Sequence, residues 1–357
     1  KMWHSGQTKG VQGAYVRDPQ TNEILISNQR HPVENLDDLP HPAWDLIDME
    51  AYFEAWGQLD SVRPGLRGVN ITASRGCPFS CTFCQPVLDA MFGRKLRQRT
   101  PGSVVDELKT LQKQYGIEAF WFTDDTFTTN RRWVEAFCLA LKESRLDLQW
   151  GCTTRANLIP EDMMETMVSV GLRKLGIGLE SATDHIREAL YQKGVSDSAV
   201  VETVRIAERY DVQVLLFLML GAPNESRQDM LDTIRLASSL PASEASFSLF
   251  VPIPGTSLHS QMKEDGFEMS ENYLDYDYYA RQPFDHHLSR WELRLWQRMA
   301  YLRFYGSRKR LPTLLKIIRD PSGQRSIRRK MKRIIPNFAD SDSKSDTILN
   351  TIPFSLS

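Results

Sequence analysis

The sequence predicts an α/β protein folded as a partial (β/α)6 barrel of the TIM-like type, with an N-terminal linker and a C-terminal helical extension. Two observations lead to this prediction. Six short apolar segments, several rich in β-branched or aromatic residues, recur between residues 68 and 251, and amphipathic helical patterns separate them. Strands that alternate with helices form parallel sheets with right-handed crossovers, and six units are fewer than a closed eight-stranded barrel needs.

The expected strands and helices alternate, except that two helices follow the fourth strand. The six expected strands are 68–73, 119–123, 148–153, 174–179, 212–220 and 245–251. The expected helices are 101–114, 131–142, 160–170, 183–191, 196–209, 226–240 and, after the last strand, 289–305. In folds of this kind the chemistry lies at the carboxyl ends of the strands, so functional side chains are expected directly after each strand.

The chain divides into four expected sections. Residues 1–66 form a linker packed along the next domain, because Pro32, Pro40 and Pro42 favour an extended segment over a helix. Residues 67–265 form the core, and residues 266–338 form a helical, basic extension. The Ser- and Asp-rich residues 339–357 are expected to be a disordered tail.

The composition is that of an ordinary globular protein, with 41% hydrophobic and 25% charged residues. A net charge of -1 argues against a wholly basic nucleic-acid binder. The sequence has no run of eighteen apolar residues and no recognisable secretion signal. Because three of the five cysteines are clustered, we expect a metal site in a reducing compartment, the cytoplasm.

The most informative motif is Cys77, Cys81 and Cys84, spaced C-x3-C-x2-C directly after the first expected strand. Gly76 and Pro78 indicate that these cysteines lie on a loop. Three thiolates can hold three irons of a [4Fe–4S] cluster, which leaves the fourth iron without a protein ligand. An open coordination position is typical of a catalytic site rather than a structural one.

Other metal sites remain open on the residues alone. A structural zinc site needs four ligands, and the nearest histidines before the motif are His4, His31 and His41. An electron-transfer ferredoxin would normally supply a fourth cysteine. The two remaining cysteines, Cys138 and Cys152, are expected to be small buried residues.

The motif C-x3-C-x-aromatic-C after the first strand of a β/α array resembles the radical S-adenosylmethionine (radical SAM) superfamily, over about residues 67–260. The resemblance implies an enzyme with a [4Fe–4S] cluster and S-adenosylmethionine as cofactors. In that family the reduced cluster passes an electron to the sulfonium, and a 5′-deoxyadenosyl radical then abstracts a substrate hydrogen. It also implies an electron donor such as ferredoxin or flavodoxin.

The resemblance assigns roles to residues at the first three strand ends. Phe83, the aromatic residue before the third cysteine, would lie near the adenine. Asp124 or Asp125, which replace the family's Gly-Gly-Glu, would meet the methionine amine, although an Asp could instead cap the helix near Asn130. The Arg155 guanidinium would form a bidentate contact with the methionine carboxylate. The alternative role for Arg155 is a structural salt bridge.

Two further strand ends resemble family patterns. Glu180 closes a segment similar to G-[IV]-E-S and would accept hydrogen bonds from the ribose hydroxyls or the amine. Gly221 lies in a partial match to G-x-I-x-G-x-x-E near the adenine, where a glycine allows close backbone approach. Phe217 and Asn224 replace two glycines of that pattern.

One branch of the family is the better match. Residues 33–45 resemble the segment that joins a cobalamin-binding domain to the radical SAM core in the magnesium-protoporphyrin ester cyclase-like subgroup. This resemblance implies methylation, cyclisation or C–C bond formation on a small organic or lipid-like substrate. The residues before Arg67 are too few for a cobalamin-binding domain, so cobalamin would be used through a domain absent from this chain, removed or never part of it.

The basic residues 303–335 alternate with apolar ones and predict peripheral contact with an anionic membrane. Contact with RNA phosphates and a solvated helix face are the alternatives, with nucleic acid ranked lower. At the level of function, an RNA- or protein-modifying enzyme of the methylthiotransferase type and a non-catalytic iron–sulfur protein remain alternatives.

Overall fold

The computed structural model describes residues 15–17, 20–26, 32–84, 89, 91–276, 284, 286–307, 310, 319 and 324. Its centre is a six-stranded parallel sheet in the order β10-β9-β8-β7-β6-β3, with β3 and β10 at the two edges. The strands are β3 (Gly68–Ile71), β6 (Ala119–Phe122), β7 (Gln149–Thr154), β8 (Leu172–Glu180), β9 (Gln213–Leu220) and β10 (Glu244–Leu249). The predicted partial (β/α)6 barrel is therefore confirmed, and each predicted strand end lies within two residues of the observed one.

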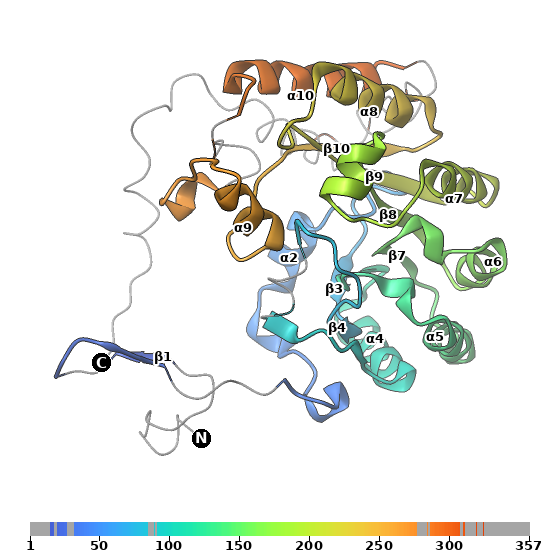
Figure 1. Ribbon diagram of the computed structural model, residues 1–357. Coiled ribbons are helices and arrows are strands. Elements are labelled where there is room, and N and C mark those ends of the chain that lie inside the picture. The colour runs from blue at the N-terminus through green and yellow to red at the C-terminus, as the bar shows by residue number, and fades with distance from the viewer. Residues whose placement is uncertain are drawn as a thin grey trace.

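Helices cover the outer face of this sheet (Figure 1). They are α4 (Pro101–Tyr115), α5 (Arg131–Ser144), α6 (Glu161–Ser169), α7 (Asp197–Arg209) and α8 (Arg227–Ser239). Four of them begin at a residue whose side chain accepts a backbone N–H of the first turn: Thr100, Asn130, Ser196 and Ser226. These caps fix where each helix starts, and with it the length of the loop between strand and helix.

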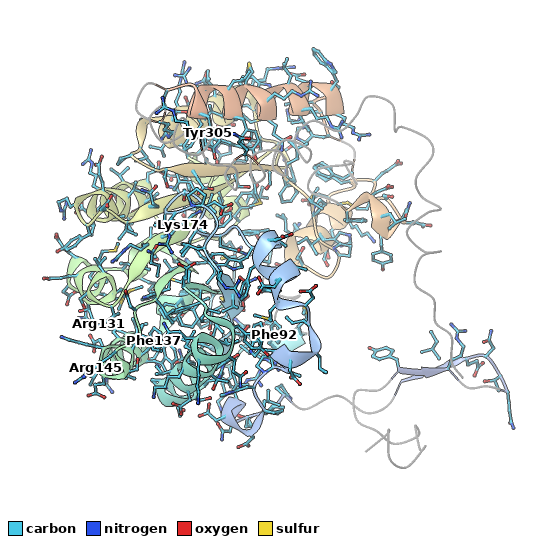
Figure 2. The ribbon with its side chains drawn as sticks, turned by 180° about the vertical axis from the view of Figure 1, so that it is seen from behind. Phe92, Arg131, Phe137, Arg145, Lys174 and Tyr305 are labelled. Carbon is cyan, nitrogen blue, oxygen red and sulfur yellow. The ribbon has the colours of Figure 1, made fainter. Side chains whose placement is uncertain are left out.

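The amino-terminal opening of the partial barrel is filled by side chains. Trp56, Leu59 and Trp121 belong to one buried apolar cluster there. The Lys174 ammonium, labelled in Figure 2, donates to the Gln58 carbonyl at 2.7 Å and pairs with the Glu244 carboxylate at 2.5 Å. Because this end is packed, the carboxyl edge of the sheet is left for chemistry.

The helix predicted at residues 183–191 is a six-residue π-helix, His185–Leu190. Buried Arg187 holds it in place: its guanidinium donates to the Ser181 carbonyl at 2.9 Å and pairs with Asp184 and Asp197. π-helices are rare and frequently occur at functional sites. This one starts five residues after Glu180 and is followed by Tyr191 and Lys193, two side chains of the site described below.

Within the N-terminal section, Glu34, Trp44 and Glu50 contact the core, and the section contains elements that the sequence did not predict. These are the antiparallel strands β1 (Tyr15–Arg17) and β2 (Ile24–Ile26), two 3-10 turns, and the helix α2 (Met49–Ala55). At the β3 edge, the Tyr52 hydroxyl accepts the Asn70 N–H at 3.3 Å, and the Trp56 indole donates to the Asn70 side chain at 3.0 Å. This segment therefore covers one open edge of the sheet.

The opposite edge is covered by α10 (Arg290–Tyr305), which lies beside α8 along the top of Figure 1. Gln297 donates to the Phe247 carbonyl at 2.6 Å, and the Tyr301 hydroxyl accepts the Phe247 N–H at 3.2 Å. The Tyr305 hydroxyl, labelled in Figure 2, accepts the Ala245 N–H at 3.2 Å. Side chains of α10 thus replace the missing neighbouring strand of β10.

Between β10 and α10 lies α9 (Ser257–Glu264), a short helix that was not predicted. Most of the basic stretch 303–335 and the whole tail 339–357 lie outside the described residues. Within the described part of the chain, no helix is both long and apolar enough to cross a membrane.

Candidate functional site

The loop that carries the three cysteines is fixed at its start. After β3 the chain forms β4 (Ser74–Arg75), which pairs with β5 (Arg97–Gln98) on the returning strand. The buried Asp124 carboxylate, directly after β6, accepts the Ala73 N–H at 3.1 Å and the Ser74 hydroxyl. Gly76 has a φ of +92°, and a Cβ there would lie 2.6 Å from the Lys95 carbonyl oxygen, so only glycine fits without a rearrangement.

The same loop is fixed again near its third cysteine. The Thr82 N–H donates to the Tyr191 carbonyl at 3.1 Å, and the Thr82 hydroxyl donates to the Leu190 carbonyl at 2.6 Å. The Leu258 N–H of α9 donates to the Thr82 carbonyl at 3.1 Å. Phe83 packs edge-on against Tyr191, with ring centroids 5.1 Å apart. The π-helix and α9 therefore both position this segment.

The three thiols of the loop are buried or half-buried and lie close enough to influence one another electrostatically. Burial raises the pKa of the Cys84 thiol to about 12, with further contributions from Cys81, Asp125 and Cys77. Burial is also the main cause that raises the pKa of Cys77. Such thiols stay protonated unless a cation replaces the protons, which fits residues that bind a positively charged iron centre.

Among the described residues, the thiols of the loop form neither a disulfide nor a site for a single metal ion. None of the five cysteines, all of which are described, forms a disulfide. Among the residues that the structure describes, no three His, Cys, Asp or Glu side chains converge on one point that would hold a single metal ion. A cubane cluster does not need such convergence, because each thiolate binds a different iron. Cys138 and Cys152 lie in the hydrophobic core, as expected.

The two predicted carboxylates at the β6 end have different environments. Both oxygens of Asp124 bind the start of the cysteine loop, and burial raises the pKa of Asp124 to about 6. Asp125 is half-buried, burial raises its pKa, and its charge acts on Cys84 and Cys77. Among the described residues, no hydrogen bond to the Asp125 carboxylate is seen. Neither Asp caps α5, because Asn130 accepts the Trp133 N–H, so the capping alternative is wrong.

Arg155, directly after β7, contacts the cysteine loop. Its Nη1 donates to Cys81 Sγ at 3.4 Å, and its guanidinium lies 3.9 Å from the centroid of the Phe79 ring. Its Nη2 donates to the Lys193 carbonyl, and its buried Nε has no hydrogen-bond partner among the described residues. Among the described residues Arg155 forms no salt bridge, since its partners are a sulfur, a ring and a carbonyl.

Glu180 ends β8 in a left-handed conformation, with a φ of +62°, next to an irregularity in the pairing of β8 with β9. Such a backbone costs about 1–3 kcal/mol for a non-glycine residue and is often found at functional sites. The Glu180 carboxylate accepts a hydrogen bond from the Lys193 ammonium at 2.8 Å, and both side chains are buried. Lys193 Nζ also lies 5.8 Å from the Phe83 ring centroid, and its charge lowers the pKa of Cys84.

Lys193 is the functional candidate that sequence reasoning missed. A lysine followed by glycine near a helix end normally indicates an exposed C-terminal turn. Its one available signal was its position, thirteen residues after Glu180, at the entry to the next β/α unit. Its burial could not be read from the sequence, because it depends on the π-helix and on the left-handed turn at Glu180.

Gly221 lies at the end of β9 with a φ of +82°, and its N–H donates to the buried Glu225 carboxylate at 2.5 Å. A Cβ on Gly221 would lie 3.0 Å from Leu293 of α10, so the close approach seen here is to that helix. Burial raises the pKa of Glu225 to about 7, although the Gly221 and Ala222 N–H groups both bind it. The predicted approach of Gly221 to an adenine stays a prediction.

Comparison with known proteins agrees with this geometry. Residues 71–237 match the Radical SAM superfamily. Residues 71–237 of this chain therefore form a radical SAM domain. An uncharacterized methyltransferase of Pyrococcus horikoshii is 29% identical over 299 residues, which cover 84% of this chain and 62% of the relative. The anaerobic magnesium-protoporphyrin IX monomethyl ester cyclase of Cereibacter sphaeroides is 26% identical over 248 residues, which cover 68% of this chain and 38% of the relative.

Among solved structures, the cobalamin-dependent S-adenosylmethionine radical enzyme OxsB, with aqua-cobalamin and S-adenosylmethionine bound, has the same fold. Its TM-score is 0.64 at 12% identity, and the match covers 91% of this chain and 51% of OxsB. The chain thus spans about half the length of the relatives it matches. The predicted radical SAM family is confirmed for residues 71–237, and the proteins of this family use a [4Fe–4S] cluster and S-adenosylmethionine. The roles of individual residues stay predictions.

Proposed function

We propose that this radical SAM domain holds a [4Fe–4S] cluster on Cys77, Cys81 and Cys84 and uses S-adenosylmethionine to methylate, cyclise or form a C–C bond in its substrate. The observation that carries the proposal is the fixed loop with three adjacent thiols at the carboxyl edge of a parallel sheet. When bound, the cluster supplies the electron that cleaves the sulfonium.

The charges around the thiols support a zwitterionic ligand. The methionine part of S-adenosylmethionine carries an ammonium and a carboxylate. Asp125, whose carboxylate accepts no hydrogen bond among the described residues, suits the ammonium, whereas Arg155 and Lys193 suit the carboxylate. In this proposal, the Glu180 carboxylate accepts hydrogen bonds from the ribose hydroxyls or the amine, and Phe83 and Gly221 flank the adenine.

For the substrate, we propose a small organic or lipid-like molecule. The relatives are by name a methyltransferase and an ester cyclase, and neither name refers to a nucleic acid or a protein substrate. The electron would come from a reduced ferredoxin or flavodoxin. Cobalamin, bound in OxsB, would serve this chain through a domain outside the residues described here. Peripheral membrane contact through 303–335 belongs to the same proposal.

The decisive experiment is anaerobic reconstitution of the chain with iron and sulfide. We would measure iron and sulfide content, the EPR spectrum of the reduced protein with and without S-adenosylmethionine, and 5′-deoxyadenosine. Cys81→Ala should lose most of the cluster and all cleavage. Cys138→Ala is the matched control, because Cys138 is a buried cysteine in the core of α5 and should leave iron content unchanged.

Two results would contradict the proposal. Equal iron content in Cys81→Ala and Cys138→Ala would remove Cys81 from the cluster. A cluster that forms on the wild type, but whose EPR spectrum does not respond to S-adenosylmethionine, would favour a non-catalytic iron–sulfur protein.

A further inference from the structure

The helix α10 has one face that is firmly attached to the core. Leu293, Gln297, Ala300 and Phe304 are buried against β9 and β10. Arg310, just beyond the helix, stacks 3.6 Å from the Phe304 ring centroid and donates to the Ala242 carbonyl at 2.9 Å. Because both the helix body and its end are anchored, the orientation of the opposite face is fixed as well.

That opposite face, the outer face of α10, is apolar and exposed. It consists of Trp291, Leu295, Met299 and Leu302, whose exposed fractions are 72%, 41%, 39% and 74%. At 100° per residue these four side chains lie within about 80° of the helix circumference. Single exposed apolar residues are ordinary, but a continuous stripe of them is typical of a surface that contacts a partner or a membrane.

Arginines border the stripe. Arg294 and Arg298 lie on one side of it and Arg303 on the other, and Arg290 is the first residue of the helix. The pKa of Arg294 is lowered first by burial and then by the charges of Arg290 and Arg298, which shows how closely these cations are placed. The one acid in the helix sequence, Glu292, already pairs with Arg227 at 2.5 Å. The surface therefore carries a positive charge around an apolar centre.

We propose that the outer face of α10 docks on an anionic lipid surface. A Trp, two Leu and a Met can enter the region below the headgroups, while the arginines reach lipid phosphates on either side. A second copy of this chain would bring like charges together, and single-stranded RNA would need more stacking rings than one Trp provides. The proposal differs from contact through 303–335, because α10 itself provides the apolar surface.

The position of α10 connects this surface to the site. Leu293 is the side chain that a Cβ on Gly221 would touch, and His286, just before the helix, contacts the Ala222 carbonyl at 3.0 Å. The first turn of α10 therefore lies at the carboxyl edge of the sheet. Docking would hold that edge near the bilayer, which extends the proposed function to a substrate that resides in or on a membrane.

The test is sedimentation of the full chain with vesicles of phosphatidylcholine, with or without phosphatidylglycerol. We expect binding to the anionic vesicles that weakens as salt is added. The double variant Trp291→Gln and Leu302→Gln should reduce the partition coefficient by at least about tenfold. The matched control is Leu46→Gln with Leu274→Gln, which removes side chains of similar exposure, 80% and 73%, from other elements.

Four results would overturn the docking proposal. The first is that the wild-type protein fails to sediment with anionic vesicles, and the second is that the α10 variant and the control lose vesicle binding equally. The third is that light scattering shows a dimer in the wild type and a monomer in the α10 variant. The fourth is RNA binding that requires Trp291. Thermal melting checks that each variant is folded. Iron content and 5′-deoxyadenosine formation are measured on the same variants and should not change. Loss of vesicle binding with normal cleavage of S-adenosylmethionine would therefore contradict docking by the variant surface but not the proposed function. Normal vesicle binding without cleavage would contradict the proposed function but not the docking.

Discussion

The carboxyl edge of the sheet has two halves that are built differently. The β3–β6 half carries the cysteine loop and two aspartates, and contacts with neighbouring strands hold the start of the loop. The β7–β8 half carries Arg155, Lys193 and Glu180, and it depends on a left-handed residue and a π-helix. The first half is acidic and rich in sulfur, and the second supplies both cations.

This difference shows how the two halves divide the proposed work. The β3–β6 half would hold the cluster and the ammonium end of the ligand, whereas the β7–β8 half would hold its carboxylate. The halves meet where Arg155 contacts both Cys81 and the Lys193 carbonyl. Variants that damage one half and leave the other intact can therefore test the division.

The largest expected effect is in the β3–β6 half, from Gly76→Ala. The added methyl would meet the Lys95 carbonyl at 2.6 Å, and the φ of +92° disfavours any side chain. Iron content after reconstitution should fall by about tenfold or more, because the loop would have to move. Gly102→Ala is the control, since nothing lies within 4 Å of that position in α4 and iron content should not change.

In the β7–β8 half, Lys193→Met should separate ligand binding from cluster binding. Iron content should stay near the wild-type value, and affinity for S-adenosylmethionine, measured by equilibrium dialysis, should fall by about tenfold, the loss of one charged contact. Glu180 would then be buried without its partner, which costs about 3–5 kcal/mol. Adding Glu180→Gln should restore the melting temperature but not the affinity; restored affinity would argue that Lys193 acts only on stability.

The two aspartates offer a finer comparison within the β3–β6 half. Asp125→Asn should weaken S-adenosylmethionine binding by roughly fivefold with little change in stability, because it removes one charge from a half-buried group. Asp124→Asn should lower the melting temperature through the contacts to Ala73 and Ser74. The opposite pattern, with affinity lost in Asp124→Asn alone, would reverse their proposed roles.

The smallest effect is a pH dependence from Glu225, outside the ligand contacts. Burial raises its pKa from 4.5 to about 7 in the folded chain, so its contribution to stability is present below 4.5 and is lost as pH rises through 7. Between about pH 6 and pH 8, the wild type should lose roughly 1 kcal/mol of unfolding free energy that Glu225→Gln does not lose. Denaturant unfolding of both proteins at the two pH values measures this difference. An equal change of unfolding free energy with pH in the wild type and in Glu225→Gln would mean that Glu225 is not protonated in the folded protein.

The same two halves differ in how far the sequence could predict them. The strands were found because β-branched and aromatic runs are visible locally, and the cysteine loop was found because its spacing is local too. The π-helix was expected as an ordinary helix, because it depends on the contacts of Arg187 with Ser181, Asp184 and Asp197. Lys193 was missed because the residues around it in the sequence do not indicate that its side chain is buried. The helix α9 was missed because an eight-residue helix gives a weak periodic signal.

The hydrogen bonds from α10 to β10 have a practical meaning for anyone who shortens this chain for expression. A chain that ended before Ser289 would lose Gln297, Tyr301 and Tyr305 together, and the outward N–H and C=O groups of Ala245 and Phe247 would face water. An open strand edge of this kind recruits other strands, so such a truncation should yield inclusion bodies or fibrils even though every cluster ligand is retained.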